Sequence, residues 1–179
     1  MLGETWVSHW GVHGRQATRG VLEPGNEAHP VLRGVGSLFG TTDVYEASPP
    51  KDAEILVRGQ VLAGMEPFDQ SAMGSKKTAA GVEQPLNEPM MPVVWVRRPL
   101  NAAGKTNTIL SVTMGAATDL LSEDLRRLLV NGARWCVGLE SPSRARADVE
   151  FVGGYLPSAF GFEGFRKGVR PEDLVSKGS

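Results

Sequence analysis

The fold of this chain is decided by residues 92–139, PVVWVRRPLNAAGKTNTILSVTMGAATDLLSEDLRRLLVNGARWCVGL. The nearly continuous apolar run Pro92–Arg98 predicts a strand that is covered on both faces. Thr106–Met114, in which apolar residues are flanked by Thr and Ser, predicts its neighbour. Between them, Ala102–Lys105 has the small and polar residues of a turn. We therefore expect an antiparallel pair of strands.

A capped helix follows this pair. Its apolar side chains recur at i, i+3, i+4, i+7 and i+11, the spacing of a helix that lays one face on a sheet: Leu125, Leu128, Leu129, Gly132 and Cys136. Ser122 is the expected N-cap, with Thr118 or Asp119 as alternatives if the helix begins earlier. Gly138 is suited to end the helix.

The composition limits the classes of protein to which the chain can belong. With 179 residues it fits one domain, and 22 Gly with 12 Pro indicate long connections. Its 19 Lys and Arg balance 20 Asp and Glu. A balanced charge offers no field for nucleic acid or for an anionic membrane surface, so we expect neither partner.

The single cysteine, Cys136, excludes an internal disulfide and a Cys-rich metal site. No apolar run approaches the roughly 20 residues of a membrane span, and the N-terminus lacks the features of a signal peptide. We expect the chain, as written, to be cytoplasmic, and an upstream signal peptide would change that location.

The remaining segments indicate shorter elements. His29–Val35 predicts about one helical turn, Thr41–Glu46 a short strand, and Glu54–Ala63 a strand that is broken or bulged near Gly59. Residues 65–89 have no apolar period and are expected to form a mobile loop. The tail, residues 141–179, is rich in aromatic residues and is expected to pack back on the domain.

Several runs resemble the ThuA-like, or trehalose-utilisation, domain, and the planctomycete-type members most closely. These runs are His29–Val35, Thr42–Tyr45, Pro89–Trp95, Thr113–Leu120 and Arg126–Trp135, with Val152–Pro157 and Phe160–Phe162 near the end. The resemblance implies an α/β fold of the class I glutamine amidotransferase type, with a flavodoxin-like parallel sheet. It also implies that residues 1–140 are the C-terminal portion of such a domain.

The function implied by the resemblance is the binding or processing of a carbohydrate or sugar derivative. The alternative is a non-catalytic binding or assembly module, or a fragment without activity of its own. Because one helix cannot cover both faces of a sheet, a second copy or a partner segment is expected to cover exposed sheet. Glutamine amidotransfer is excluded, because Cys136 lies on the apolar stripe of the helix and lacks a nucleophile turn.

The best polar constellation is the loop Ser8–Gly14, which holds His9, Trp10 and His13. The indole could stack on a pyranose while the imidazoles bind hydroxyl groups. A metal site is the weaker interpretation, because only His29 and scattered carboxylates remain to complete it. The non-functional alternative is that these are exposed or structural loop histidines.

Four further residues are ligand-binding candidates: Asp43, its near neighbour Tyr45, Arg19 and Gly115. Asp43 could act as a base, orient a histidine, or simply cap backbone amides. Arg19 could hold an anion or pair with Glu23. Gly115 lies between a strand end and a helix start, where amides favour anionic or hydroxyl groups. No cofactor motif is present, and no catalytic residue can be assigned.

Overall fold

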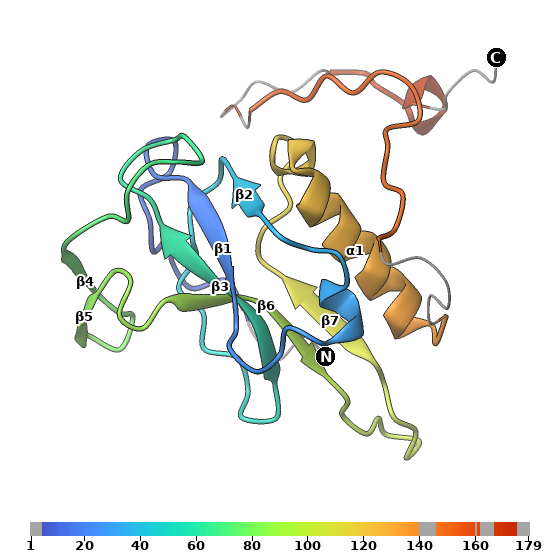
Figure 1. Ribbon diagram of the computed structural model, residues 1–179, viewed down its shortest axis with the longest axis horizontal. Helices are drawn as coiled ribbons and strands as arrows, with labels where there is room; N and C mark the ends of the chain where they lie inside the picture. The colour runs from blue at the N-terminus through green and yellow to red at the C-terminus, as the bar shows by residue number, and fades with distance from the viewer. Residues whose placement is uncertain (1–4, 140–145, 160, 162–166, 175–179) are drawn as a thin grey trace.

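The computed structural model describes residues 5–139, 146–159, 161 and 167–174, and its central feature is a five-stranded antiparallel sheet (Figure 1). The strand order is β2-β1-β3-β6-β7, and the sheet curls into a half-barrel. The strands are β1 (Thr18–Leu22), β2 (Leu38–Gly40), β3 (Glu54–Val61), β6 (Met91–Arg97) and β7 (Ile109–Val112). Each neighbouring pair in this sheet is antiparallel.

The unit predicted from residues 92–139 is confirmed. β6 and β7 pair with Val94 opposite Val112 and Trp95 opposite Ser111. The helix α1 (Glu123–Cys136) follows, and the Ser122 hydroxyl accepts a hydrogen bond from the Leu125 amide at 3.4 Å. Gly138, with φ of 73°, ends it in the left-handed region that glycine favours.

The helix packs closely on the sheet, and its apolar side chains fill the core. Leu125 and Leu128 are completely buried. Gly132 allows the close approach, because a Cβ added there would lie only 2.2 Å from Cδ2 of Leu110 in β7. The apolar stripe read from the sequence therefore faces the sheet, as a period of 3.6 residues requires.

The predicted flavodoxin-like parallel sheet is wrong. Parallel neighbours need crossover connections, usually helices, of a dozen or more residues. The described residues contain one α-helix, α1, and it follows the last strand instead of joining two strands. Neighbouring strands are instead linked by turns and loops, as between β6 and β7, which gives an antiparallel sheet.

Of the predictions for the shorter elements, some are confirmed and others are not. The helical turn is present as a 3-10 helix, η1 (Pro30–Leu32), and a second one, η2 (Asp119–Leu121), begins at the residue considered as an alternative cap. The irregularity of β3 falls between Ile55 and Arg58, just before Gly59. The strand expected at residues 41–46 is reduced to one bridge between His9 and Tyr45. The segment 65–89 contains a hairpin of β4 (Ser75–Lys77) and β5 (Glu83–Pro85).

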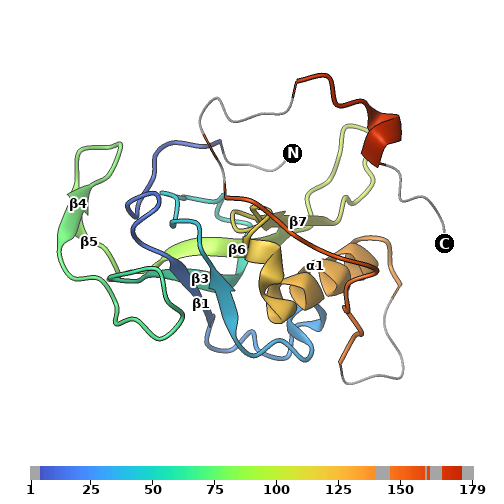
Figure 2. The same ribbon diagram turned by 90° about the horizontal axis from the view of Figure 1, so that it is seen from above.

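The first described part of the tail, from residue 146, runs along α1, whereas η3 (Pro171–Leu174) stands apart from it (Figure 2). The Arg126 guanidinium sits 3.9 Å from the centre of the Phe151 ring, and its Nε donates to the Val149 carbonyl. The Tyr155 hydroxyl donates to the Ala117 carbonyl at 2.6 Å. Phe160, Phe162 and Phe165 lie outside the described residues, which end with a short 3-10 helix, η3 (Pro171–Leu174).

Candidate functional site

The histidine loop is held against the segment that carries Asp43. Besides the bridge between His9 and Tyr45, the Trp10 amide donates to the Val44 carbonyl at 2.7 Å. The chain then turns back, and Gly11 passes so close that an added Cβ would lie 3.0 Å from Cβ of Asp43. This close contact brings the two histidines, four residues apart, around a single carboxylate.

Asp43 bridges the two imidazoles, one with each carboxylate oxygen. Nδ1 of His9 lies 2.8 Å from Oδ2, and Nδ1 of His13 lies 3.0 Å from Oδ1. The Asp43 side chain is only 1% exposed, whereas those of His9 and His13 are 43% and 41% exposed. In a neutral histidine whose Nδ1–H donates to a carboxylate, Nε2 carries the basic lone pair, which is the arrangement of an oriented general base.

We call His9, His13 and Asp43 the histidine cluster. Tyr45 lies beside it. Its ring meets that of His9 edge to face, with centroids 5.4 Å apart. Burial raises the pKa of the Tyr45 phenol, and the negative charges of Asp43 and Asp119 raise it further. Tyr45 is therefore a neutral hydrogen-bond donor at ordinary pH.

His13 forms part of the wall of a cavity of about 770 Å³. The described residues that line it include no Lys, Arg, Asp or Glu, and hydroxyl groups are frequent among them: His13, Gly14, Thr41, Thr42, Met65, Ala116, Ala117, Thr118, Ser158, Ala159 and Gly161. The Thr41 hydroxyl donates to that of Thr118 at 2.8 Å. In the described part of the lining, four hydroxyl-bearing residues and the imidazole suit an uncharged polar ligand.

The amides near Gly115 serve a protein carboxylate. Oδ2 of Asp119 accepts from the amides of Gly115 at 3.1 Å and Ala116 at 3.2 Å, and from the Thr42 hydroxyl at 2.5 Å. Asp119 is 1% exposed. The strand-end position of Gly115 was read as ligand-binding, but its amide supports the wall of the cavity through Asp119. Sequence reasoning considered Asp119 only as a helix cap.

Trp10 and Arg19 are placed in structural roles. Trp10 is 1% exposed and its Nε1 donates to the Leu86 carbonyl at 2.9 Å, so its ring offers no face to a sugar. The Arg19 guanidinium donates to the Pro67 and Asp69 carbonyls, at 2.8 and 2.7 Å. Glu23, its predicted partner, pairs instead with Arg58.

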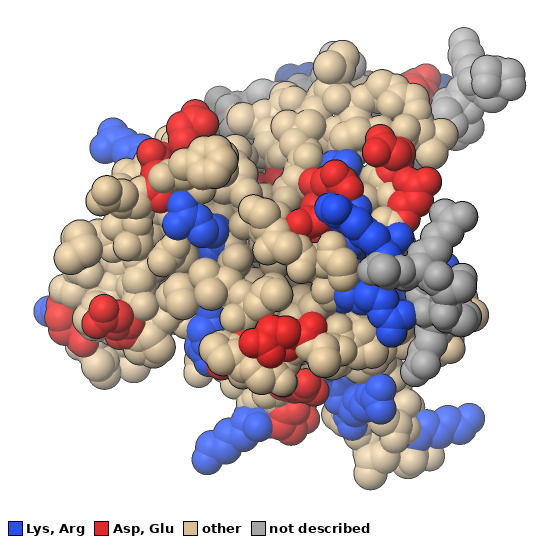
Figure 3. Space-filling model, viewed as in Figure 1, with Lys and Arg blue, Asp and Glu red and all other residues tan. Residues whose placement is uncertain are grey.

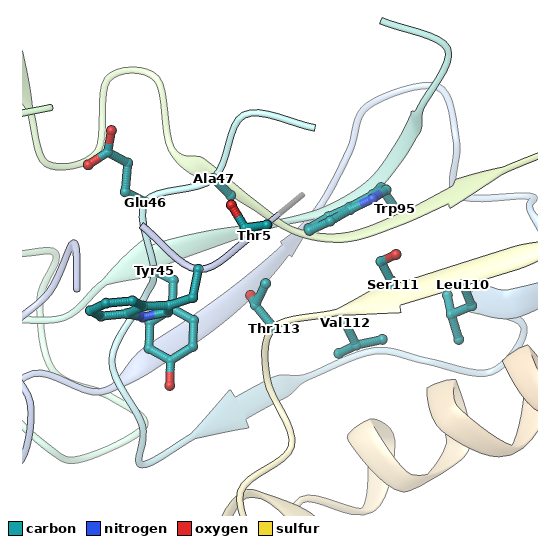
Figure 4. Close-up of a pocket in the computed structure, with 10 residues that line it drawn as sticks. Thr5, Tyr45, Glu46, Ala47, Trp95, Leu110, Ser111, Val112 and Thr113 are labelled. Atoms are coloured by element: carbon teal, nitrogen blue, oxygen red, sulfur yellow. The ribbon is translucent and has the colours of Figure 1, made fainter. Parts of the chain in front are cut away.

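A second cavity, of about 400 Å³, is lined by Tyr45 together with residues of β6 and β7 (Figure 4). Figure 4 shows Trp95 and Ser111 toward one end of it and Tyr45 toward the other. Among the described residues, the Trp95 Nε1 and the Ser111 hydroxyl are buried and have no hydrogen-bond partner. Because both atoms are buried, neither is available to hydrogen-bond a ligand in this cavity.

The face of the molecule seen in Figure 3 gives little support to a polyanionic partner. On the face seen in Figure 3, acidic and basic side chains are interspersed rather than separated into patches of one sign. No helix within the described ranges is both long and apolar enough to cross a membrane.

Comparison with known protein families, with curated proteins and with solved structures finds no significant match.

Proposed function

We propose that the chain binds a carbohydrate, or a closely related neutral molecule rich in hydroxyl groups, in the cavity beside His13. The observation that carries the proposal is the buried Asp43 carboxylate, which holds Nδ1 of two half-exposed imidazoles, one of which, His13, lines that cavity. The ThuA-like resemblance of the sequence supports the same class of ligand.

The lining of the cavity favours neutral ligands over charged ones. Hydroxyl groups and an imidazole can exchange hydrogen bonds with sugar hydroxyls in either direction. A sugar phosphate or sugar acid would need a cationic group, and none of the described lining residues is Lys or Arg. Because Trp10 is buried, hydrogen bonds rather than stacking supply the affinity.

The histidine cluster also supplies the means to process such a ligand. An imidazole whose Nδ1–H is held by a carboxylate can take a proton from a hydroxyl, or from a carbon next to the carbonyl of an oxidised sugar. Asp43 fixes the tautomer and stabilises the imidazolium that forms. Proton transfer is thus the step that this site is equipped to perform.

Calorimetry of the full chain with a panel of ligands tests this proposal. We expect trehalose or glucose to bind, and glucose 6-phosphate to bind more weakly. His13→Ala should reduce binding by at least about tenfold, since the imidazole is a polar contact in a partly desolvated site.

His29→Ala is the matched control, because His29 lies at η1 and packs against Trp135, away from the cavity. Equal binding of the sugars by the wild type and by His13→Ala would contradict the proposal. Tighter binding of the sugar phosphate would contradict the argument from the neutral lining.

The non-catalytic assembly module is a second candidate, favoured by β7 at one edge of the sheet. An edge strand presents unpaired backbone groups that another chain can join. Light scattering would then show an oligomer, and a stable monomer at high protein concentration would contradict this candidate.

A further inference from the structure

We propose that His9, His13 and Asp43 bind a divalent first-row transition-metal ion of the zinc class. The proposal rests on these three side chains and not on sugar binding. One ligand atom from each lies within 4.8 Å of the others, and the described residues contain no second group of this kind.

The donor set and its spacing fit such an ion. Two imidazole nitrogens and one carboxylate oxygen form a common set of ligands for zinc and for non-haem iron. Bonds of about 2.0–2.2 Å to a tetrahedral ion place neighbouring ligand atoms about 3.3 Å apart. The Nδ1 atoms of His9 and His13 lie 2.8 and 3.0 Å from opposite oxygens of Asp43, and one ligand atom from each residue lies within 4.8 Å of the others. Rotation of the half-exposed imidazoles would bring both nitrogens and one carboxylate oxygen around a common ion.

The backbone already holds the ligands in position. The bridge between His9 and Tyr45, and the hydrogen bond from the Glu46 amide to the Ser8 carbonyl at 3.0 Å, fix the two segments on either side of the cluster. Gly11 lets the loop close over Asp43. A site that is organised before binding loses little conformational entropy when the ion enters.

The negative charge of the buried Asp43 carboxylate favours the binding of a cation at the cluster. Its side chain is 1% exposed, and its ion-pair partners among the described residues are two imidazoles, which are charged only when protonated. A buried carboxylate that faces neutral donors is costly unless it is paired or coordinates a metal. A divalent ion at the cluster supplies that compensation.

The site is also open on one side. The two imidazoles are about two-fifths exposed, and His13 lines the cavity of about 770 Å³. Three protein ligands with a fourth position left for water or substrate are typical of catalytic rather than structural zinc sites. In the loaded form Nδ1 coordinates the ion, and a bound water or a ligand hydroxyl completes the coordination.

His29, the third histidine of the chain, lies outside this site. Its Nδ1 accepts a hydrogen bond from the Val31 amide at 3.2 Å, and its ring packs against Trp135. From the sequence, only His29 and scattered carboxylates remained to complete a metal site, and the structure brings one of these carboxylates, Asp43, to the two histidines.

Titration of the metal-free full chain with Co²⁺ and Zn²⁺ alone, without any sugar, tests the proposal. We expect one ion per chain, with a Co²⁺ visible spectrum that is displaced by Zn²⁺. His9→Ala, His13→Ala and Asp43→Asn should each weaken binding by more than about 100-fold, since even the outer partners of metal ligands are worth 10- to 100-fold.

His29→Ala is the control and should bind as the wild type does. Circular dichroism and urea unfolding show whether Asp43→Asn remains folded, and the two variants at half-exposed histidines keep the test decisive if it does not. Absence of binding by the wild type, unchanged binding by the His9 and His13 variants, or an equal loss in His29→Ala would each overturn the proposal. Sugar binding measured separately in a chelator distinguishes this outcome from failure of the proposed function.

Discussion

Asp124 in α1 and Asp43 beside the histidine loop are both buried carboxylates, and they are compensated differently. Asp124 accepts from the amides of Ser37 and Gly36, at 2.7 and 2.9 Å, and pairs with the guanidiniums of Arg127 and Arg146. Within the part of the chain that the structure describes, the ion-pair partners of Asp43 are two imidazoles.

This difference separates a structural carboxylate from a functional one. The permanent charge of arginine and the two amides make Asp124 a fixed link between α1 and the loop before β2. Imidazoles can lose a proton, transfer it or bind a metal, so the surroundings of Asp43 can change state. Asp119 lies between these cases, since backbone amides and the Thr42 hydroxyl satisfy it.

The largest effect should come from Asp124→Ala. The Arg127 guanidinium is almost fully buried, and the substitution removes one of its two carboxylate partners and leaves two amides without an acceptor. We expect a loss of about 3 kcal/mol in the free energy of unfolding, measured with urea. A loss below about 1 kcal/mol would show that Asp124 is not the fixed link described above.

Asp119→Ala should have the next largest effect. It leaves the amides of Gly115 and Ala116 without their acceptor beneath the cavity wall. We expect a loss of about 2 kcal/mol by urea unfolding, together with weaker sugar binding. Thr118→Ala, which removes the Thr41–Thr118 hydrogen bond, is the control and should cost about 0.5 kcal/mol.

The stabilisation that the ionised Asp124 carboxylate provides should be present at neutral pH and be lost in acid. Burial alone would raise the pKa of Asp124, but the Ser37 and Gly36 amides and the two guanidiniums together lower it. A lowered folded-state pKa contributes stability above the unfolded pKa of about 3.9, and that stability is lost as the pH falls through the folded value. Between pH 7 and pH 3 the wild type should therefore lose more stability than Asp124→Asn, and equal losses would contradict this assignment.

The smallest effect on stability should come from Asp43→Asn. The amide keeps the shape of the side chain while it removes a buried charge that, among the described residues, forms ion pairs with two imidazoles and with no Lys or Arg. We expect a change within about 1 kcal/mol by urea unfolding, while Co²⁺ binding is lost. If stability falls as far as in Asp124→Ala, Asp43 is a structural carboxylate and the contrast between the two sites fails.

The extent to which the sequence predicts the structure differs between these regions. β6, β7 and α1 were predicted because each depends on local pattern: an apolar run, a turn, a stripe of period 3.6 and a Ser122 cap. The relative direction of the strands was predicted wrongly. It depends on contacts between distant segments, and the prediction of a parallel sheet came from the family resemblance rather than from any local pattern. The hairpin β4–β5 was missed because its short strands carry no apolar alternation.

The candidate site shows the same limit. His9 and His13 stood out by residue type and Gly-rich context, and Asp43 was considered as a residue that could orient a histidine. Their contact joins positions 34 and 30 apart in sequence. The burial of Trp10, and the Asp119 acceptor for the amides predicted at Gly115, follow from packing that no local pattern records.

The sequence by itself determined the elements and the candidate chemistry: two strands, a capped helix and a loop with two histidines. These follow from intrinsic preferences that act over a few residues. Only the tertiary structure decided that the sheet is antiparallel, that Trp10 belongs to the core, and that Asp43 lies between the histidines. Those outcomes depend on which distant surfaces bury one another, because apolar burial is non-directional and is settled only by the whole packed chain.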